Sequence, residues 1–323
     1  MKKTLVAVAA ITAVTGAMAQ ATISGAIEMG YTSATTSTAG SVATTKRLGD
    51  EHANSALNIN ASEDLGGGMK ADMQFGFLPV VDTQGSSTTS YQSFVGLSGD
   101  FGRVQGGAFV HSQANVVFSY DLMGAWGLSV ANFAGSNTGY FMKNQLKYSL
   151  PAIAKGFTAD YTKGFGETTG SKVGDSNTYA IGYKTGGFSG DYAYTTISSS
   201  TTVTMIASNV GLSYDFGMAK VSALIASQKN GSNTTVTGSS YGVSVPFGAA
   251  AIAVQQSNAT AYTASTTAAP TAVAQSALDW KVSYALSKRT NVYAMYGSAS
   301  GYGTAAATGN SNKKTQFFVL HSF

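Results

Sequence analysis

The alternation of apolar and polar residues, with a period of two, is the feature of this sequence that most restricts its fold. From Leu278 to Leu286 every second residue is apolar, and the residues between them are mostly polar. The same alternation recurs in the stretches 178–184, 209–216 and 240–247. A period of two places successive side chains on opposite faces of a β-strand, so the pattern predicts an all-β chain without long helices.

The connections between the predicted strands alternate between short and long. Short turns such as Asp64–Gly68 and Asp215–Gly217 are separated by long segments rich in Ser, Thr, Asn and Gly. We count about 16 strands, about seven short turns and about eight long loops, which is the pattern of a transmembrane antiparallel β-barrel. This count puts both termini on the short-turn, periplasmic side. The predicted long loops are 33–53, 78–89, 110–143, 164–177, 198–206, 229–238, 257–277 and 299–313.

The low content of charged residues supports a barrel in a membrane. Only 11% of the residues are charged, against about 25% in ordinary soluble domains. One face of each strand in a membrane barrel meets lipid, so fewer charges are needed than in a soluble β-sandwich. The chain has no cysteine, which excludes disulfide frameworks and thiolate metal sites. A net charge of +4 is too small to indicate a nucleic-acid partner, and we expect no cofactor and no metal.

The first residues have the order of an export signal. Met1–Lys3 is positively charged, Thr4–Thr15 is apolar and small, and Ala17–Ala19 reads Ala-Met-Ala, a cleavage site. This apolar run is too short to span a membrane. The sequence therefore predicts a cleaved signal peptide over residues 1–19 and one barrel domain over residues 20–323.

The final strand carries a second signal. Phe323 is the last residue, and Val319 and Phe317 share its face of the strand. A terminal Phe on an alternating strand looks like the signal read by the outer-membrane barrel assembly machinery, so we expect that machinery to be a partner during biogenesis.

Several stretches together resemble one family. They are Ala21–Tyr31, Ser62–Lys70, Phe94–Gly102, Val210–Lys220, Tyr284–Thr290 and the closing Phe323. In them the chain resembles the Gram-negative general porins of the β-proteobacterial type. The resemblance implies a homotrimer of 16-stranded barrels surrounded by outer-membrane lipid, in which the long third loop folds into each lumen. It also implies passive diffusion of ions and small hydrophilic solutes, and no enzymatic activity.

Candidate pore residues follow from strand parity and from the third loop, 110–143, which is the longest. A porin selects ions by the diameter of its lumen and by the charges at its narrowest ring. An acidic loop facing basic wall residues would create a transverse field across the pore. The constriction candidates are His111 and Asp121 in the loop and Lys70, Lys147, Lys184, Lys281 and Asp160 on the wall. Further inward carboxylates are Glu28, Asp72, Asp191 and Asp279.

The chain departs from its apparent relatives where they carry basic pore residues. Ala56 stands where the family pattern has Arg, and Asn60 stands where it has Lys. Ala108 stands where another Arg is expected. We therefore predict a pore less positive than in typical relatives, with weak ionic selectivity.

Aromatic residues on outward faces predict contact with the membrane interface. Tyr179, Tyr183, Tyr214, Trp280 and Tyr284 have this parity, and rings of this kind form girdles at both membrane surfaces. Stacking platforms for sugars inside the pore are the alternative. The aromatics near loop three that could face the pore are Phe109, Phe118 and Trp126.

Three other readings remain open. The Ser/Thr-rich loops could make the barrel an adhesin or a phage receptor. His111 and Ser112 are neighbours, as an outer-membrane hydrolase would need, but no orienting acid is near them in sequence. The run Asp50–His52 could bind a cation in loop one, although a solvated charge run is the more common explanation for such a sequence.

Overall fold

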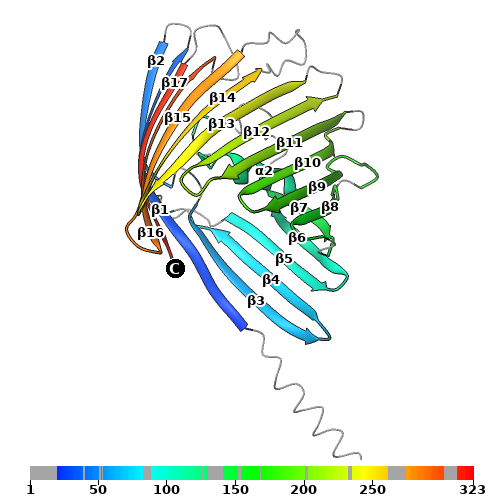
Figure 1. Cartoon of the computed structure of the whole chain (residues 1–323). Helices are drawn as coiled ribbons and strands as arrows, with labels where there is room; N and C mark the ends of the chain where they lie inside the picture. The colour runs from blue at the N-terminus through cyan, green and yellow to red at the C-terminus, as the bar shows by residue number, and fades with distance from the viewer. Residues whose placement is uncertain are drawn as a thin grey trace, which may run out of the picture.

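The computed structural model is built almost entirely of strands (Figure 1). It describes residues 20–38, 41–50, 52, 54–79, 81–82, 89–124, 127–129, 141–151, 154–167, 169–200, 203–231, 235–260, 274–301 and 311–323. The predicted signal peptide and Trp126 lie outside these residues. The strands are β1 (Gln20–Thr38), β2 (Ser41–Gly49), β3 (Ala56–Gly66), β4 (Met69–Leu78), β5 (Thr89–Gly99), β6 (Gly102–Val110), β7 (Phe141–Ser149), β8 (Phe157–Gly164), β9 (Ser176–Thr185), β10 (Phe188–Ser198), β11 (Thr204–Asp215), β12 (Lys220–Asn230), β13 (Val236–Phe247), β14 (Ala250–Thr260), β15 (Ala274–Ala285), β16 (Thr290–Ser300) and β17 (Ser311–Ser322).

The strands form one antiparallel sheet that closes on itself. The first strand pairs with the last, from Ala26 opposite Ser322 to Ser37 opposite Ser311. The backbone of Phe323 completes this closure, because its N–H donates to the Gly25 oxygen at 3.0 Å and its oxygen accepts from the Gly25 N–H at 3.2 Å. Closure leaves no open sheet edge, as a sheet in lipid requires.

Two of the strands share one position in the barrel. The upper half of β1 pairs with β2, from Gly30 opposite Gly49, whereas its lower half pairs with β3, from Ala26 opposite Ala56. The described residues between Gly49 and Ala56 leave the sheet. The sheet therefore has 17 strands but sixteen barrel positions, which confirms the predicted architecture.

The two ends of the barrel differ as predicted. Seven short connections join β3 to β4, β5 to β6, and so on to β15 and β16, and they lie at the end where β1 starts and the chain ends. The prediction of a long first loop over 33–53 was wrong, because β1 continues to Thr38 and β2 begins at Ser41. Thr is β-branched and fits a strand well, and the Thr35 and Thr44 hydroxyls meet across this hairpin at 2.9 Å.

The outward faces are apolar and exposed. Tyr179 is 53% exposed, Trp280 47% and Tyr284 48%. In a transmembrane β-barrel such residues meet the membrane, so the parity assigned from the sequence is confirmed. No helix in the described part of the chain is long and apolar enough to cross a membrane.

The described part of the connection between β6 and β7, residues 111–124 and 127–129, folds into the barrel. It begins with the helix α2 (Ser112–Tyr120), which lies inside the ring of strands behind β10 and β11 (Figure 1). Six of its nine residues are buried. This confirms that the third loop enters the lumen.

Candidate functional site

The described part of loop three, residues 111–124 and 127–129, packs against one side of the lumen. Val116, Val117 and Tyr120 form an apolar cluster with small inward residues of the wall, such as Ala193 and Ala277. The wall also lacks a side chain at Gly211, where a Cβ atom would lie 2.0 Å from the Tyr120 ring. These small side chains make room for the loop.

The start of α2 is tied to β7 and β8 by charged groups. The Ser112 hydroxyl donates to Asp160 Oδ1 at 2.6 Å, and Lys147 Nζ lies 3.3 Å from the same hydroxyl. Lys147 Nζ is also 3.6 Å from Asp160 Oδ2, and both side chains are less than one-fifth exposed. Lys147 and Asp160 thus meet as a pair that holds the loop.

The end of α2 is tied to β10 and β12. The Tyr120 hydroxyl donates to the Asp191 carboxylate. The Ser222 hydroxyl donates to the Tyr120 backbone oxygen at 2.6 Å. Asp191 therefore holds a loop residue.

The residues after α2 are tied to β14 and β15. Gln255 donates to Asp121 Oδ1 at 2.8 Å, while its own amide oxygen accepts from the Leu122 N–H at 2.8 Å. Lys281 donates to the Leu122 backbone oxygen. Asp279 is 1% exposed and accepts from the Leu128 N–H at 2.9 Å. These polar groups act as anchors, because each satisfies a backbone or side-chain group of the loop.

The opposite wall, on β3 to β6, is open to the lumen. Asn58, Asn60 and Gln74 are inward and half-buried, whereas inward residues behind the loop, such as Thr195 and Gln255, are at most 1% exposed. The open passage therefore lies between loop three and the β3–β6 wall. Its wall is rich in neutral amides, and the Gln74 amide donates to Asn58 Oδ1 at 2.8 Å.

One close ion pair lies on this open wall. Arg103 Nη2 is 2.6 Å from Asp72 Oδ2, and the two side chains are 29% and 32% exposed. The guanidinium also donates to Gln105 and lies 5.5 Å from the centre of the Phe94 ring. Gly96 makes room for the pair, since a Cβ there would be 2.6 Å from Arg103 Nη2. Sequence reasoning assigned Asp72 to the lumen but did not place Arg103 there; the alternation of β6 could have found it.

The two alanines that were expected to replace pore arginines lie on opposite faces of the barrel wall. Ala56 lies opposite Ala26 on the inward face of β3. The interpretation of Ala108 was wrong, because Ala108 lies opposite Ser93 and alternates with the buried Phe109. Its parity is that of Val104, which is outward and 37% exposed. An arginine at 108 would have pointed away from the lumen.

The described residues between β2 and β3, which are Asp50, His52, Asn54 and Ser55, fold inward over β1. His52 Nδ1 lies 2.6 Å from Glu28 Oε1, and Asn54 donates to Glu28 Oε2 at 2.5 Å. The Ser55 hydroxyl accepts from the Glu28 N–H at 2.9 Å, which replaces a ladder bond lost where the strand leaves the sheet. His52 and Glu28 are buried, so the expectation of a solvated charge run does not hold for His52; Glu51 lies outside the described residues.

The other predicted pore residues are spread over the lumen. His111 and Asp121 are buried at 0% and 4%, and Lys184 is exposed at the short-turn end of β9. Lys70 is exposed at the short-turn end of β4, on the inward face of the open wall and two residues before Asp72. The predicted constriction residues therefore do not form one ring in the structure, and a role for them in the constriction stays a prediction. Phe109 is buried and Phe118 is 39% exposed.

Charges at the long-loop end of β7 and β8 are paired. Lys143 Nζ lies 2.5 Å from Glu167, and its hydrogen bond lowers the pKa of that carboxyl. Asp175 accepts from the Gly166 N–H at 2.8 Å, which lowers the pKa of Asp175, and Lys163 lies 3.5 Å away. Among the described residues no group of three or more His, Asp or Glu side chains is placed to hold a metal ion.

Comparison with known proteins agrees with this geometry. The model of the Gram-negative porin family matches residues 7–304. The chain belongs to the Gram-negative porin family. It is 30% identical over 251 residues to outer membrane porin protein 32 of Delftia acidovorans, covering 71% of this chain and 70% of that protein.

Solved porins share the fold of this porin. An anion-selective porin from Comamonas acidovorans superposes with a TM-score of 0.79 at 23% identity, over 95% of this chain and 100% of that one. OmpT of Vibrio cholerae in its trimer form superposes with a TM-score of 0.69 at 13% identity, over 94% and 99% of the two chains. The protein is thus an outer-membrane porin, a channel of a family and fold that are not enzymatic.

Proposed function

We propose that this porin is a passive diffusion channel for ions and small hydrophilic solutes with weak ionic selectivity. The ion pair between Arg103 and Asp72 on the open wall carries this proposal. Two opposite charges 2.6 Å apart nearly cancel in their effect on a passing ion. Toward the long-loop end, the wall residues near the pair are neutral amides, and toward the short-turn end Lys70 lies opposite Asp64. The charges of Lys147, Asp160 and Asp191 are engaged in anchoring loop three.

The remaining expectations follow from family membership. We propose a homotrimer, since a related porin of known structure has a trimer form. We also propose that residues 1–19 are a cleaved signal peptide, that the mature domain is 20–323, that the assembly machinery reads the last strand, and that the porin has no catalytic activity.

The reversal potential in a planar bilayer tests the selectivity. With a tenfold KCl gradient across one reconstituted porin, we expect a potential close to zero, because neither ion is favoured at the open wall. A potential near the chloride or potassium equilibrium value would contradict weak selectivity while leaving the channel function intact.

A substitution at Phe323 can distinguish recognition of the final strand by the assembly machinery from closure of the barrel. Phe317, Val319 and Phe323 are exposed on the outer face at 54%, 44% and 46%. Phe323→Ala keeps the two backbone bonds to Gly25 but removes the ring. We expect much less folded porin in the outer membrane, measured by heat-modifiable migration, with unchanged refolding in detergent. Slow refolding in detergent would instead assign the ring to barrel stability.

A further inference from the structure

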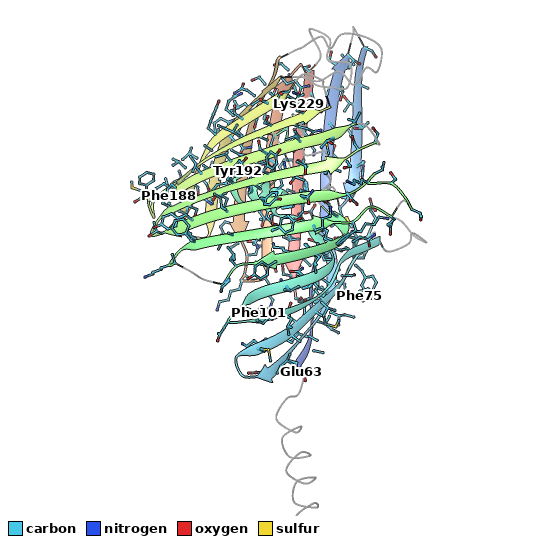
Figure 2. All side chains as sticks on the ribbon, turned by 90° about the vertical axis from the view of Figure 1, so that its right-hand side faces the viewer. Glu63, Phe75, Phe101, Phe188, Tyr192 and Lys229 are labelled. Atoms are coloured by element: carbon cyan, nitrogen blue, oxygen red, sulfur yellow. The ribbon has the colours of Figure 1, made fainter. Side chains whose placement is uncertain are left out.

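A hollow of about 640 Å³ lies on the outer wall of the barrel over β7 to β11. We call it the outer groove. Figure 2 looks onto this wall and labels Phe188 and Tyr192, two of its lining residues. Most of the lining is apolar, and its large side chains are Leu150, Phe157, Ile181, Tyr183, Phe188 and Tyr192.

The outer groove exists because small residues interrupt rows of large ones. Gly190 pairs with Tyr183 on one side and with Leu212 on the other. It therefore leaves a gap between two large outward side chains. Ala159 has the same position opposite Ile181. Small residues in β8 and β10 therefore form the groove. The ring centroids of Phe157 and Tyr183, which also line it, are 4.4 Å apart.

One lysine lies at the short-turn end of the outer groove. Lys155 stands between the lining residues Ala154 and Phe157, in the short turn before β8, and is exposed. The backbone beside it is fixed, because the Lys184 N–H donates to the Gly156 oxygen at 2.8 Å. The side chain of Lys184 has inward parity, since Lys184 follows the outward Tyr183, and it takes no part in the groove. The one acidic lining residue, Asp191, turns its carboxylate to Tyr120 inside the barrel.

We propose that the outer groove binds one glycerophospholipid of the periplasmic leaflet, with an acyl chain in the hollow and the phosphate beside Lys155. The apolar lining and the cationic end match the two parts of such a lipid. The short turns place this end at the periplasmic surface, so the lipid comes from the periplasmic leaflet. Each buried methylene of an acyl chain favours binding, and a lysine near an anionic headgroup adds to it.

Filling the hollow tests the acyl-chain part. In Gly190→Leu the atoms nearest to the new Cβ would be the ends of the Leu212 and Phe188 side chains, so the barrel should fold and conduct as before. We expect native mass spectrometry of the detergent-solubilised porin, titrated with phosphatidylglycerol, to show loss of one bound lipid. Ala223→Leu, outward on β12 and outside the groove, should retain it. Equal retention by both variants would overturn the proposal.

Removing the cation tests the phosphate part. In Lys155→Gln we expect the affinity for phosphatidylglycerol to fall about fivefold. The exposed periplasmic pair Lys288 and Arg289, changed to Gln together, should have no effect. A phosphatidylglycerol with a photoreactive acyl chain should label residues 150–192 in the native protein and not in Gly190→Leu. Labelling spread evenly over all outward strands would show a general lipid shell and contradict a site.

Discussion

Arg103→Gln is expected to make the porin prefer cations, and Asp72→Asn is expected to make it prefer anions. Each change leaves one charge of the pair without its partner on the open wall, where the side chains are about 30% exposed. A unit charge about 4 Å from a passing ion in water changes the ion's energy by about 1 kcal/mol. The permeability of each ion should therefore change about fivefold and the potassium-to-chloride permeability ratio about 25-fold, in opposite directions for the two variants.

The double variant is the decisive control for this prediction. Arg103→Gln/Asp72→Asn should return the reversal potential nearly to that of the native porin, since no net charge is left at the pair. Arg289→Gln removes an exposed arginine in the β15–β16 turn and should change little. If Arg103→Gln and Arg289→Gln shifted the potential equally, the selectivity would depend on total charge rather than on this wall.

Asp279→Ala is expected to release part of loop three. The carboxylate accepts from the buried Leu128 N–H, and the alanine would leave that donor without this acceptor. A buried donor without an acceptor costs about 1–3 kcal/mol. The undocked state of the loop should therefore be populated about 5- to 150-fold more. Single-channel records should show frequent current fluctuations.

Asp279→Asn separates the anchoring role from a role of the charge. The asparagine oxygen can still accept from the Leu128 N–H. The single-channel current should therefore show no added fluctuations, and the reversal potential should not change. A shifted reversal potential in Asp279→Asn with a quiet current would mean that the Asp279 charge acts on permeating ions. That result would contradict the assignment of Asp279 as an anchor.

The architecture could be read from the sequence because it depends on local periodicity. Alternation along segments such as 278–286 fixes which face of each strand is apolar, and the structure exposes Trp280 and Tyr284 as that pattern requires. The alternation of short and long connections similarly fixes which end carries the turns. The boundaries of the first hairpin were missed, since Ser- and Thr-rich segments suit both loops and strands.

The pore was harder to predict because parity shows only that a side chain points inward. It does not show whether the lumen there is open or filled. Asp160, Asp191 and Lys281 do point inward, but loop three covers them, and the small residues that admit the loop, such as Gly211 and Ala193, come from strands far along the chain. Contacts between residues so distant in sequence leave no local signal.

The sequence by itself determined a closed sixteen-position barrel, its orientation and the lipid-facing side of its wall. It could do so because backbone pairing in lipid allows few alternatives to alternating strands. Only the tertiary structure decided which inward charges anchor loop three and which meet the open passage. That division depends on where one loop packs, and it leaves Arg103 beside Asp72 on the open wall.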